Sequence, residues 1–324
     1  TISRNYRIMY MKYVVHSIMN QKPEAILIDS SNLLHRAVWI AENVRTNVNP
    51  SYIFLTSIKK YTKMFDCNNI YSVWDKRLIR GVKNYRRVAK NVEYKGTRDV
   101  EKNNRVFSFE EKTTELLNSL GIKNMYPGIL EADDVISWLS NKIEGNKVIV
   151  SVDQDMLQLI DDNTCVYSPI KDIIIDKGNF ESITSVTLEH FLRYKSLMGD
   201  KSDNIPGIPK CGPKTALKLV RECVTDEDLI KKLGHEKLEP YFLNKRLIDL
   251  NQGIIEHPDD EVLYQKQYTE LEHHEGDANV FREHCKELNI HNILDKFNDW
   301  QQSFFEHQTK TTLESIVKKL QIDK

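Results

Sequence analysis

The sequence predicts an α/β fold, in which a central, mostly parallel sheet is flanked by helices and followed by a helical region. Three short apolar runs, at residues 25–29, 70–75 and 147–153, alternate with segments of helical periodicity, which is typical of a doubly wound sheet. Each run ends on an aspartate. Because ligands bind at the carboxyl ends of strands in such sheets, we expect these aspartates to meet in one site.

The elements of the first half are expected in alternating order. The first strand leads into a helix that starts near Ser30, and a second helix begins at Pro50 and ends near Phe65. The basic segment after the second strand has glycines and little apolar periodicity, which predicts a loop or mobile helices. The elements that follow are a helix at 107–120, a strand at 122–126, an acidic helix at 131–143, the strand at 147–153, a short helix at 156–160, and flanking strands at Val166 and 173–175.

The second half is predicted to be helical. A helix at 188–198 and another that starts at Pro213 enclose two glycine-bearing turns. Proline suits the first turn of a helix, so this pattern predicts a helix–hairpin–helix element. A plain helical turn is the alternative. We find no internal repeat and no low-complexity tract.

The composition is that of a soluble globular protein of one large or two modest domains, with 324 residues, 40% of them hydrophobic and 29% charged. No apolar run approaches the ~20 residues that a membrane helix needs, and the first 22 residues lack a signal-peptide pattern. The five cysteines are scattered without a Cys-x-x-Cys pair, which predicts free thiols in a reducing cytoplasm and neither a zinc site nor disulfides.

The charge distribution is uneven although the net charge is only −1. Residues 76–105 contain eleven basic side chains against three acidic ones. Such a run is often only a solvated face. Within it, however, Arg86-Arg87 and the stretch from Tyr94 to Arg98 interleave cations with an aromatic ring, which suits single-stranded nucleic acid. The hairpin can offer Lys210 or Lys214 to duplex phosphates without reading sequence.

Nine carboxylates stand where the predicted fold would gather them. Two ionised carboxylates about 5 Å apart repel by roughly 3 kcal/mol at an effective dielectric near 20, so the cluster needs protons or divalent cations. Oxygen donors without His or Cys favour Mg²⁺ or Mn²⁺ over Zn²⁺, and two such ions can hold the attacking water and the leaving oxygen of a phosphodiester. The nine are Asp29, Asp75, Glu131, Asp133, Asp134, Asp153, Asp155, Asp200 and Asp203.

Spacing along the acidic helix separates its three carboxylates. Glu131 and Asp134 share a face, whereas Asp133 points about 100° away from Asp134. We therefore expect some of the nine to hold metal ions through water. For any single carboxylate, an ordinary helix cap or a complement to the helix dipole is the alternative.

The chain resembles the 5′ nucleases, which include bacteriophage 5′-3′ exonucleases or flap endonucleases and the 5′-nuclease domain of bacterial DNA polymerase I. The resemblance covers about residues 25–225 and, more weakly, extends to about 295. It is carried in order by Ile28-Asp29-Ser30-Ser31-Asn32, Val73-Trp74-Asp75, Tyr94-Lys95-x-x-Arg98, Glu131-Ala132-Asp133-Asp134, Ser151-x-Asp153-x-Asp155 and Gly199-Asp200-x-Ser202-Asp203-Asn204-Ile205-Pro206-Gly207.

The resemblance implies a two-part organisation. Residues 1–180 would form a PIN-like α/β metal-site core that includes a helical arch at 76–107. Residues 181–324 would form a helical DNA-binding region with the helix–hairpin–helix variant of this family at about 187–222. All nine carboxylates fall on metal-site positions, with Mg²⁺ as the expected ion, Mn²⁺ as a substitute, and K⁺ at the hairpin.

The resemblance also assigns roles to single residues. Lys95 falls on the lysine at the foot of the arch that polarises the scissile phosphate, and Lys95, Arg87 and Asp153 are the expected catalytic residues. The residues expected to bind nucleic acid are Arg36, Arg86, Arg87, Tyr94, Lys95, Arg98, Gly207, Lys210, Gly212 and Lys214. Two features depart from the family: Ser30 replaces the usual glycine, and the stretch between Asp75 and Arg87 is longer.

The expected reaction is hydrolysis near a free 5′ end or at a flap junction by a metal-activated water, which leaves a 5′-phosphate. We expect a free-standing, monomeric phage enzyme in the host cytoplasm that removes RNA primers or flaps from DNA and RNA–DNA hybrids. Residues 301–305 loosely resemble a sliding-clamp pentapeptide, although a helix end fits better, and residues 312–320 suit a tail for a single-strand-binding protein or a capping helix. The alternatives are a phosphatase that uses Asp153-x-Asp155 and a catalytically idle DNA-binding scaffold.

Overall fold

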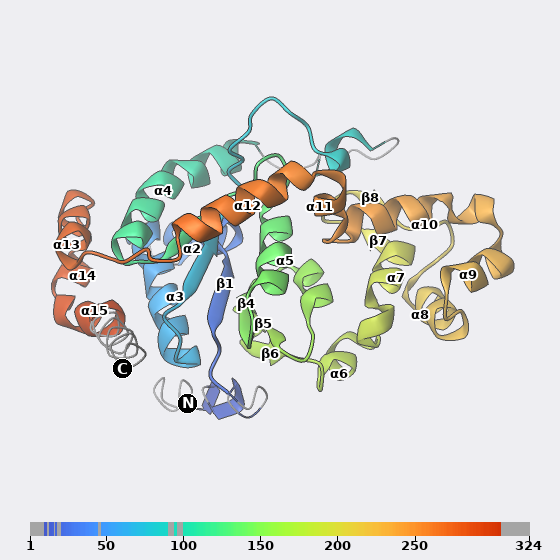
Figure 1. Ribbon diagram of the computed structural model, residues 1–324, viewed down its shortest axis with the longest axis horizontal. Helices are drawn as coiled ribbons and strands as arrows, with labels where there is room; N and C mark the ends of the chain where they lie inside the picture. The colour runs from blue at the N-terminus through green and yellow to red at the C-terminus, as the bar shows by residue number, and fades with distance from the viewer. Residues whose placement is uncertain are drawn as a thin grey trace, which may run out of the picture.

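A six-stranded sheet forms the centre of the molecule in the computed structural model (Figure 1). The structure describes residues 10–11, 13–15, 17, 21–44, 47–89, 94–95 and 100–305, with side chains in the last range from residue 105. The strands are ordered β3-β2-β1-β4-β5-β6, and all neighbours are parallel except β5 and β6. Their bounds are β1 Ala25–Asp29, β2 Ile70–Val73, β3 Lys123–Met125, β4 Lys147–Val150, β5 Thr164–Ser168 and β6 Ile173–Ile175. The predicted fold class is confirmed.

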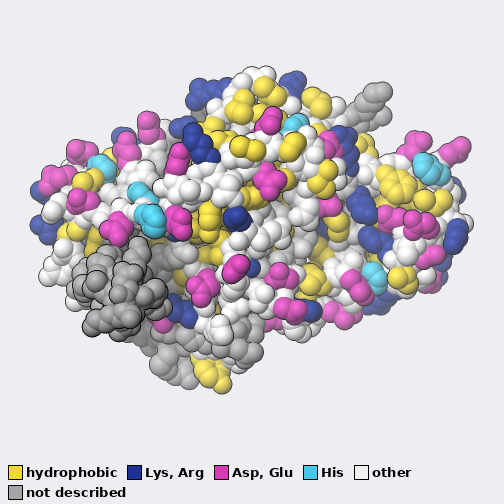
Figure 2. Space-filling view, in the orientation of Figure 1, with side chains coloured by type: hydrophobic (Ala, Val, Ile, Leu, Met, Phe, Trp, Pro, Cys, Tyr) yellow, Lys and Arg dark blue, Asp and Glu magenta, His cyan; other side chains and the backbone are white. Residues whose placement is uncertain are grey.

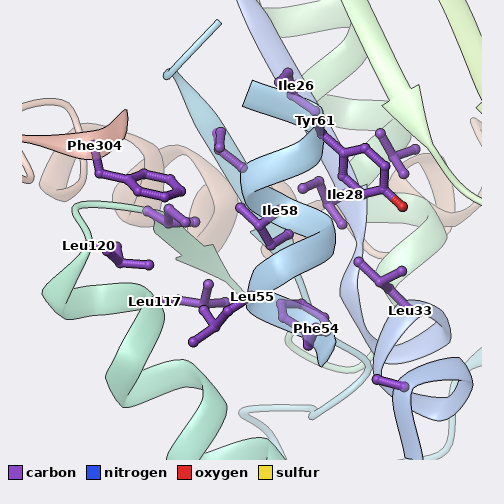
Figure 3. Packing of buried hydrophobic residues seen from close by; sticks show 14 of the residues in the cluster. Ile26, Ile28, Leu33, Phe54, Leu55, Ile58, Tyr61, Leu117, Leu120 and Phe304 are labelled. Atoms are coloured by element: carbon purple, nitrogen blue, oxygen red, sulfur yellow. The ribbon is translucent and has the colours of Figure 1, made fainter. Parts of the chain in front are cut away.

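The central strand β1 is buried on both faces because helices cover both sides of the sheet. Its side chains alternate between the two faces, as the period of a strand requires. Ile26 and Ile28 pack with α2 Ser30–Asn43, α3 Pro50–Phe65 and α4 Val100–Ser119 (Figure 3), whereas Ala25 and Leu27 pack with α5 Ala132–Lys142. The apolar run at 25–29 is therefore a strand between two cores.

Caps place the helices close to where the sequence predicts them. Asn49 caps α3 by accepting from the Ser51 backbone N–H, and Pro50 occupies the first helical position. Glu131 and Asp134 form a capping box at the start of α5. Two predictions are corrected. Helix α4 begins at Val100 rather than 107, and the helix expected at 156–160 is a 3₁₀ turn, η2 Gln154–Leu159.

The hairpin lies between α7 Leu188–Met198 and α8 Pro213–Glu222. Its first turn is a small antiparallel pair, β7 Gly199–Asp200 and β8 Ile205–Pro206. Gly199 has φ +70°, and a Cβ there would lie 2.4 Å from the Gly207 backbone nitrogen. A side chain at either glycine would force these two backbone segments apart, which explains why glycine stands at both positions.

The hairpin helices share a small core with α9 Asp226–Leu233 and α10 His235–Ile248. The remaining helices, however, return to the sheet (Figure 1). Tyr264 of α12 packs edge-on against Trp138 of α5, and Trp300 of α15 belongs to the same core as α3. The bounds of these helices are α11 Gln252–Glu256, α12 Pro258–Glu270, α13 Ala278–Glu287, α14 His291–Leu294 and α15 Phe297–Phe304. The division at residue 180 stays a prediction.

Phe304 is buried and stacks on Trp300 within α15, with ring centroids 5.8 Å apart (Figure 3). The stretch expected to resemble a clamp-binding peptide is thus the end of an amphipathic helix packed on the core. Residues 312–320 lie outside the described part of the chain. The visible surface mixes acidic and basic side chains (Figure 2), as the net charge of −1 suggests.

One buried carboxylate fixes the turn before the acidic helix. Asp260 of α12 accepts hydrogen bonds from the backbone N–H groups of Gly128, Ile129 and Leu130 at 3.0–3.2 Å, and from the Tyr264 hydroxyl at 3.0 Å. A Cβ at Gly128 would lie 2.3 Å from the carboxylate. This contact spans about 130 residues of sequence and sets where α5 begins.

Replacing Asp260 by alanine is expected to lower the free energy of unfolding by about 3 kcal/mol or more. Three backbone N–H groups and one hydroxyl would lose their acceptor in a buried turn. Urea unfolding followed by circular dichroism measures this change. Asp259→Ala, at the exposed neighbouring residue, is the control and should change stability by less than about 0.5 kcal/mol. Equal effects of the two substitutions would show that the hydrogen bonds of Asp260 do not stabilise this turn.

Candidate active site

Three aspartates meet at the carboxyl ends of adjacent strands. Asp29 ends β1, Asp75 follows β2, and Asp153 follows β4. Asp29 caps α2 through one oxygen and accepts from the Ser151 hydroxyl, at 2.8 Å, through the other. Asp75 accepts from the Ala132 backbone N–H at 3.1 Å, which joins the end of β2 to the start of the acidic helix.

Mutual repulsion marks this group of carboxylates. Burial and the charges of Asp75 and Asp153 raise the pKa of Asp29 from an ordinary 3.8 to about 7, against a hydrogen bond from Ser151. Burial and the charge of Asp153 hold the pKa of Asp133 well above its usual range, with Lys95 opposing. Asp29, Asp75, Asp133 and Asp153 therefore form a cluster of interacting, oxygen-only donors.

A divalent cation fits this donor set. Bound positive charge would restore the ionised state of Asp29 and Asp133, and carboxylate oxygens are the ligands that Mg²⁺ and Mn²⁺ prefer. Within the part of the chain that the structure describes, no three of these groups already stand in a metal-ready arrangement. The role of the four carboxylates as ligands stays a prediction.

A second acidic group adjoins the first and contains an internal cation. The Lys195 ammonium of α7 lies 2.9 Å from Asp155 Oδ1 and 2.5 Å from Asp200 Oδ2. Burial and the charge of Asp153 raise the pKa of Asp155 to about 6, against the pull of Lys195. Sequence reasoning missed Lys195, because nothing in its helical surroundings distinguishes it from a solvated lysine.

Lys95 links the acidic helix to the hairpin. Its ammonium donates to Glu131 Oε2 at 2.9 Å and lies 3.9 Å from Asp203 Oδ2, and its backbone N–H donates to the Asp203 carbonyl at 3.0 Å. Lys95 has φ +54°, a left-handed conformation uncommon for a side-chain-bearing residue. Although burial works in the opposite direction, the charges of Lys95 and Arg86 lower the pKa of Glu131 to about 2, so Glu131 is an ionised partner of these cations.

Two residues with predicted site roles, Arg86 and Asp134, pair with each other. Arg86 donates to both oxygens of Asp134, at 2.6 and 2.8 Å, and to the Leu247 carbonyl at 3.0 Å. Asp134 also accepts from the Glu131 backbone N–H. Both side chains are fully enclosed. Both oxygens of Asp134 are thus engaged by Arg86, and the roles of these two residues in metal and nucleic-acid binding stay predictions.

Tyr94 contacts the acidic helix as well. It is buried, and its hydroxyl donates to Glu131 Oε2 at 2.8 Å, so its ring is not open to stacking with a base. The ring instead lies against two cations, with the Arg87 guanidinium 5.4 Å and the Lys95 ammonium 5.0 Å from its centroid. Arg87 donates to the Tyr94 carbonyl at 3.0 Å and keeps about a third of its side chain exposed.

The other predicted nucleic-acid residues lie in three places. Arg36 is half-buried on α2, where its charge acts on the Tyr61 phenol. Lys210, Gly212 and Lys214 are exposed around the second hairpin turn, and Gly207 is held in the close backbone contact described above. Arg98 lies outside the described residues. These contacts to nucleic acid remain predictions.

Two family models match the chain. The N-terminal resolvase-like domain of 5′-3′ exonucleases matches residues 24–185, and the C-terminal SAM fold of the same family matches residues 186–286. The chain belongs to the 5′-3′ exonuclease family. A 5′-3′ exonuclease of Buchnera aphidicola subsp. Schizaphis graminum is 34% identical over 210 residues, which are 62% of this chain and 71% of that protein. The one from Halalkalibacterium halodurans is 28% identical over 253 residues, 72% and 81% respectively.

Solved structures share the fold of this exonuclease. The bacteriophage T5 D15 protein crystallised with metal ions aligns with a TM-score of 0.63 at 21% identity, over 76% of this chain and 99% of that one. Human GEN1 in complex with Holliday junction DNA aligns with a TM-score of 0.55 at 14% identity, over 90% and 77%. The resemblance deduced from sequence motifs is confirmed, and the chain is a 5′-3′ exonuclease by family.

Substituting Arg86 by methionine should destabilise the exonuclease by about 3–5 kcal/mol, because it leaves the Asp134 charge buried without a partner. Urea unfolding measures the loss. Lys83→Met, on an exposed side chain of the same segment, is the matched control. If the double variant Arg86→Met with Asp134→Leu were no more stable than Arg86→Met alone, the buried pair would not be the cause.

The stability of the metal-free exonuclease should fall with rising pH through Asp29. Its pKa is about 7 in the folded protein and 3.8 otherwise, so its contribution is fully present below about pH 4 and is lost as the pH rises to 7. In EDTA, Asp29→Asn should therefore gain about 2 kcal/mol relative to wild type between pH 5 and pH 8.

Thermal melts of both proteins with EDTA and with Mg²⁺ check this expectation. Mg²⁺ at pH 8 should raise the Tm of wild type more than that of Asp29→Asn. Asp162→Asn, an exposed residue, serves as the control. A Tm difference between Asp29→Asn and wild type that is the same at both pH values would contradict the assigned pKa.

Proposed function

We propose that this chain is a structure-specific 5′ nuclease, which hydrolyses phosphodiesters near 5′ ends and at flap junctions with the help of two divalent metal ions. The supporting observation is an electrostatically interacting group of carboxylates around the carboxyl ends of β1, β2 and β4, next to the buried cation Lys95. The group consists of Asp29, Asp75, Asp133 and Asp153. An anionic cluster beside a fixed ammonium suits a substrate that is both phosphate-bearing and metal-bound.

The carboxylates divide into two sets of prospective ligands. One set is Asp29, Asp75, Asp133 and Asp153, and the other is Asp155, Asp200 and Asp203, with Asp153 electrostatically coupled to both. Mg²⁺ is the proposed ion and Mn²⁺ its substitute. When bound, such ions activate water and neutralise charge on the phosphate. Glu131 pairs with Lys95, so its proposed contribution to a metal runs through water.

Protein side chains supply the remaining functions. Ser151 holds Asp29, and Ala132 holds Asp75, in fixed orientations. Glu131 and Asp203 hold Lys95 where its ammonium would stabilise negative charge that develops on the scissile phosphate. Arg87 stands beside Lys95, with part of its guanidinium in solvent, where it can contact the same strand.

The hairpin is proposed to hold the duplex part of the substrate. Lys210 and Lys214 are exposed on either side of Gly212, where ammonium groups and backbone N–H groups can contact phosphates without reading sequence. K⁺ is the proposed ion at this hairpin. A flap endonuclease form of the T5 D15 protein has been crystallised with DNA and metal ions, and it shares this fold with a TM-score of 0.64 at 21% identity.

The proposed biological role is removal of RNA primers or flaps during DNA replication in a phage-infected cell, by a monomer in the host cytoplasm. A single-strand-binding protein and a sliding clamp are the proposed partners. Among the described helices, none has both the length and the apolar character to cross a bilayer.

The decisive experiment compares Asp153→Asn with wild type on a 5′-flap duplex that carries an RNA tail. Cleavage in Mg²⁺ should fall by a factor of about 10²–10³, because Asp153 belongs to the first proposed metal set and its charge acts on the second. Gel mapping of the products should show a 5′-phosphate on the downstream fragment. Flap binding in Ca²⁺, followed by fluorescence anisotropy, should change by less than about threefold.

Asp162→Asn, an exposed residue just before β5, is the control and should cleave normally. Unchanged turnover of Asp153→Asn would refute the metal assignment. DNA binding that survives EDTA without cleavage under any condition would favour a scaffold, and a covalent aspartyl-phosphate would favour a phosphatase.

A further inference from the structure

A cavity of about 480 Å³ lies between the start of the basic segment and α4, with Asp75 on its wall. The segment is held in place: the backbone N–H groups of Leu78 and Ile79 donate to the carbonyls of Pro127 and Gly128, at 2.9 and 3.1 Å. The cavity therefore has a fixed wall, adjoins the acidic site, and has the volume of a small-ligand pocket.

A buried carboxylate in this cavity lacks a partner. Glu110 of α4 lines the cavity and is only 4% exposed. Among the described residues, no hydrogen-bond donor or ion-pair partner contacts it. Burial raises its pKa to about 7, with the charge of Lys76 opposing and that of Asp75 adding to the rise. Its oxygens are not among the fully enclosed side-chain atoms that lack a partner; they open onto the cavity, where a donor on a ligand can reach them.

The rest of the cavity suits a nucleotide. Ile79, Val82 and Phe107 line it and are about half exposed, which is unusual for apolar side chains unless something covers them. Lys76 and Arg80 stand on the same segment with their side chains exposed. Figure 2 shows hydrophobic and basic side chains side by side along the upper edge, over the segment drawn in cyan in Figure 1. Aromatic stacking beside cations is how proteins bind unpaired bases.

We propose that this cavity binds one unpaired base of the substrate strand and prefers guanine, with Glu110 as the hydrogen-bond acceptor. This inference rests on the proposed function, since it needs a single strand beside Asp75. Guanine presents two adjacent donors, N1–H and the N2 amino group, to a carboxylate. Thymine presents one N–H between two carbonyl oxygens, which a carboxylate repels. Phe107 would stack on the base, and Lys76 and Arg80 would contact the neighbouring phosphates.

The test measures binding rather than cleavage. Flap duplexes with an all-thymine single strand, and the same strands with one guanine moved stepwise from the junction, are titrated with the full chain at pH 8 in Ca²⁺. At one position, guanine should tighten binding by about tenfold. Glu110→Gln should abolish this preference. Glu111→Gln, the exposed neighbour at the same cavity, should retain it.

Base analogues and a second variant sharpen the result. Inosine, which lacks the N2 amino group, should bind more weakly than guanine, whereas 7-deazaguanine should match guanine because its Watson–Crick edge is intact. Phe107→Ala, on a half-exposed residue that the fold does not require, should weaken binding of guanine and thymine flaps alike by about fivefold or more.

Equal affinity of the wild type for guanine and thymine at every position would overturn the proposal, and so would a guanine preference that survives Glu110→Gln in a protein with wild-type Tm. A change in Mg²⁺ affinity on Glu110→Gln without any base preference would instead assign Glu110 to the metal cluster. Failure of the proposed nuclease function is distinguishable, because it would appear as cleavage by Asp153→Asn while these binding measurements stand.

Discussion

Repulsion between carboxylates at the ends of β1, β2 and β4 is the constraint on which the site depends. Parallel pairing of these three strands places Asp29, Asp75 and Asp153 at the same end of the sheet, and burial makes the charge of Asp29 costly. This unfavourable interaction is located at the carboxyl ends of strands in an otherwise well-packed sheet. A cluster of this kind is stable only with protons or bound cations, which is why the same residues that destabilise the metal-free fold suit metal-dependent hydrolysis.

The acidic residues differ in whether they form an ion pair with a buried lysine or arginine. Arg86 neutralises Asp134, Lys95 neutralises Glu131, and Lys195 bridges Asp155 and Asp200. No such ion pair is present for Asp29 or Asp133 among the described residues. Asp29 and Asp133 of the first proposed metal set thus lack a direct ion pair, although the charge of Lys95 acts on Asp133. The second set contains Lys195, with which a bound metal ion would have to compete.

Long-range contacts position the site. The Asp260 carboxylate of α12 accepts hydrogen bonds from the turn at 128–130 and so fixes the start of α5, although α12 is far along the chain. The bond between the Lys95 backbone and Asp203 joins the basic segment to the hairpin. Through these contacts, the helices after residue 180 both carry the proposed duplex-binding surface and hold the acidic site in place. A substitution in α12 can therefore affect the acidic helix although the two helices are far apart in the sequence.

The sequence by itself determined the order of strands and helices, the aspartates at the strand ends and the two glycines of the hairpin. These features follow from local periodicity, caps and backbone conformation, which short stretches of sequence determine. Only the tertiary structure decided which charges pair. Asp134 and Asp133 are neighbours in the sequence, yet one faces Arg86 and the other faces the acidic cluster. No sequence motif distinguishes Lys195 or Glu110. Lys195 matters because the fold places it between two carboxylates, and Glu110 because the fold buries it without an ion pair among the described residues. Pairing in a buried site depends on distances and burial between residues remote in sequence, and no local pattern contains that information.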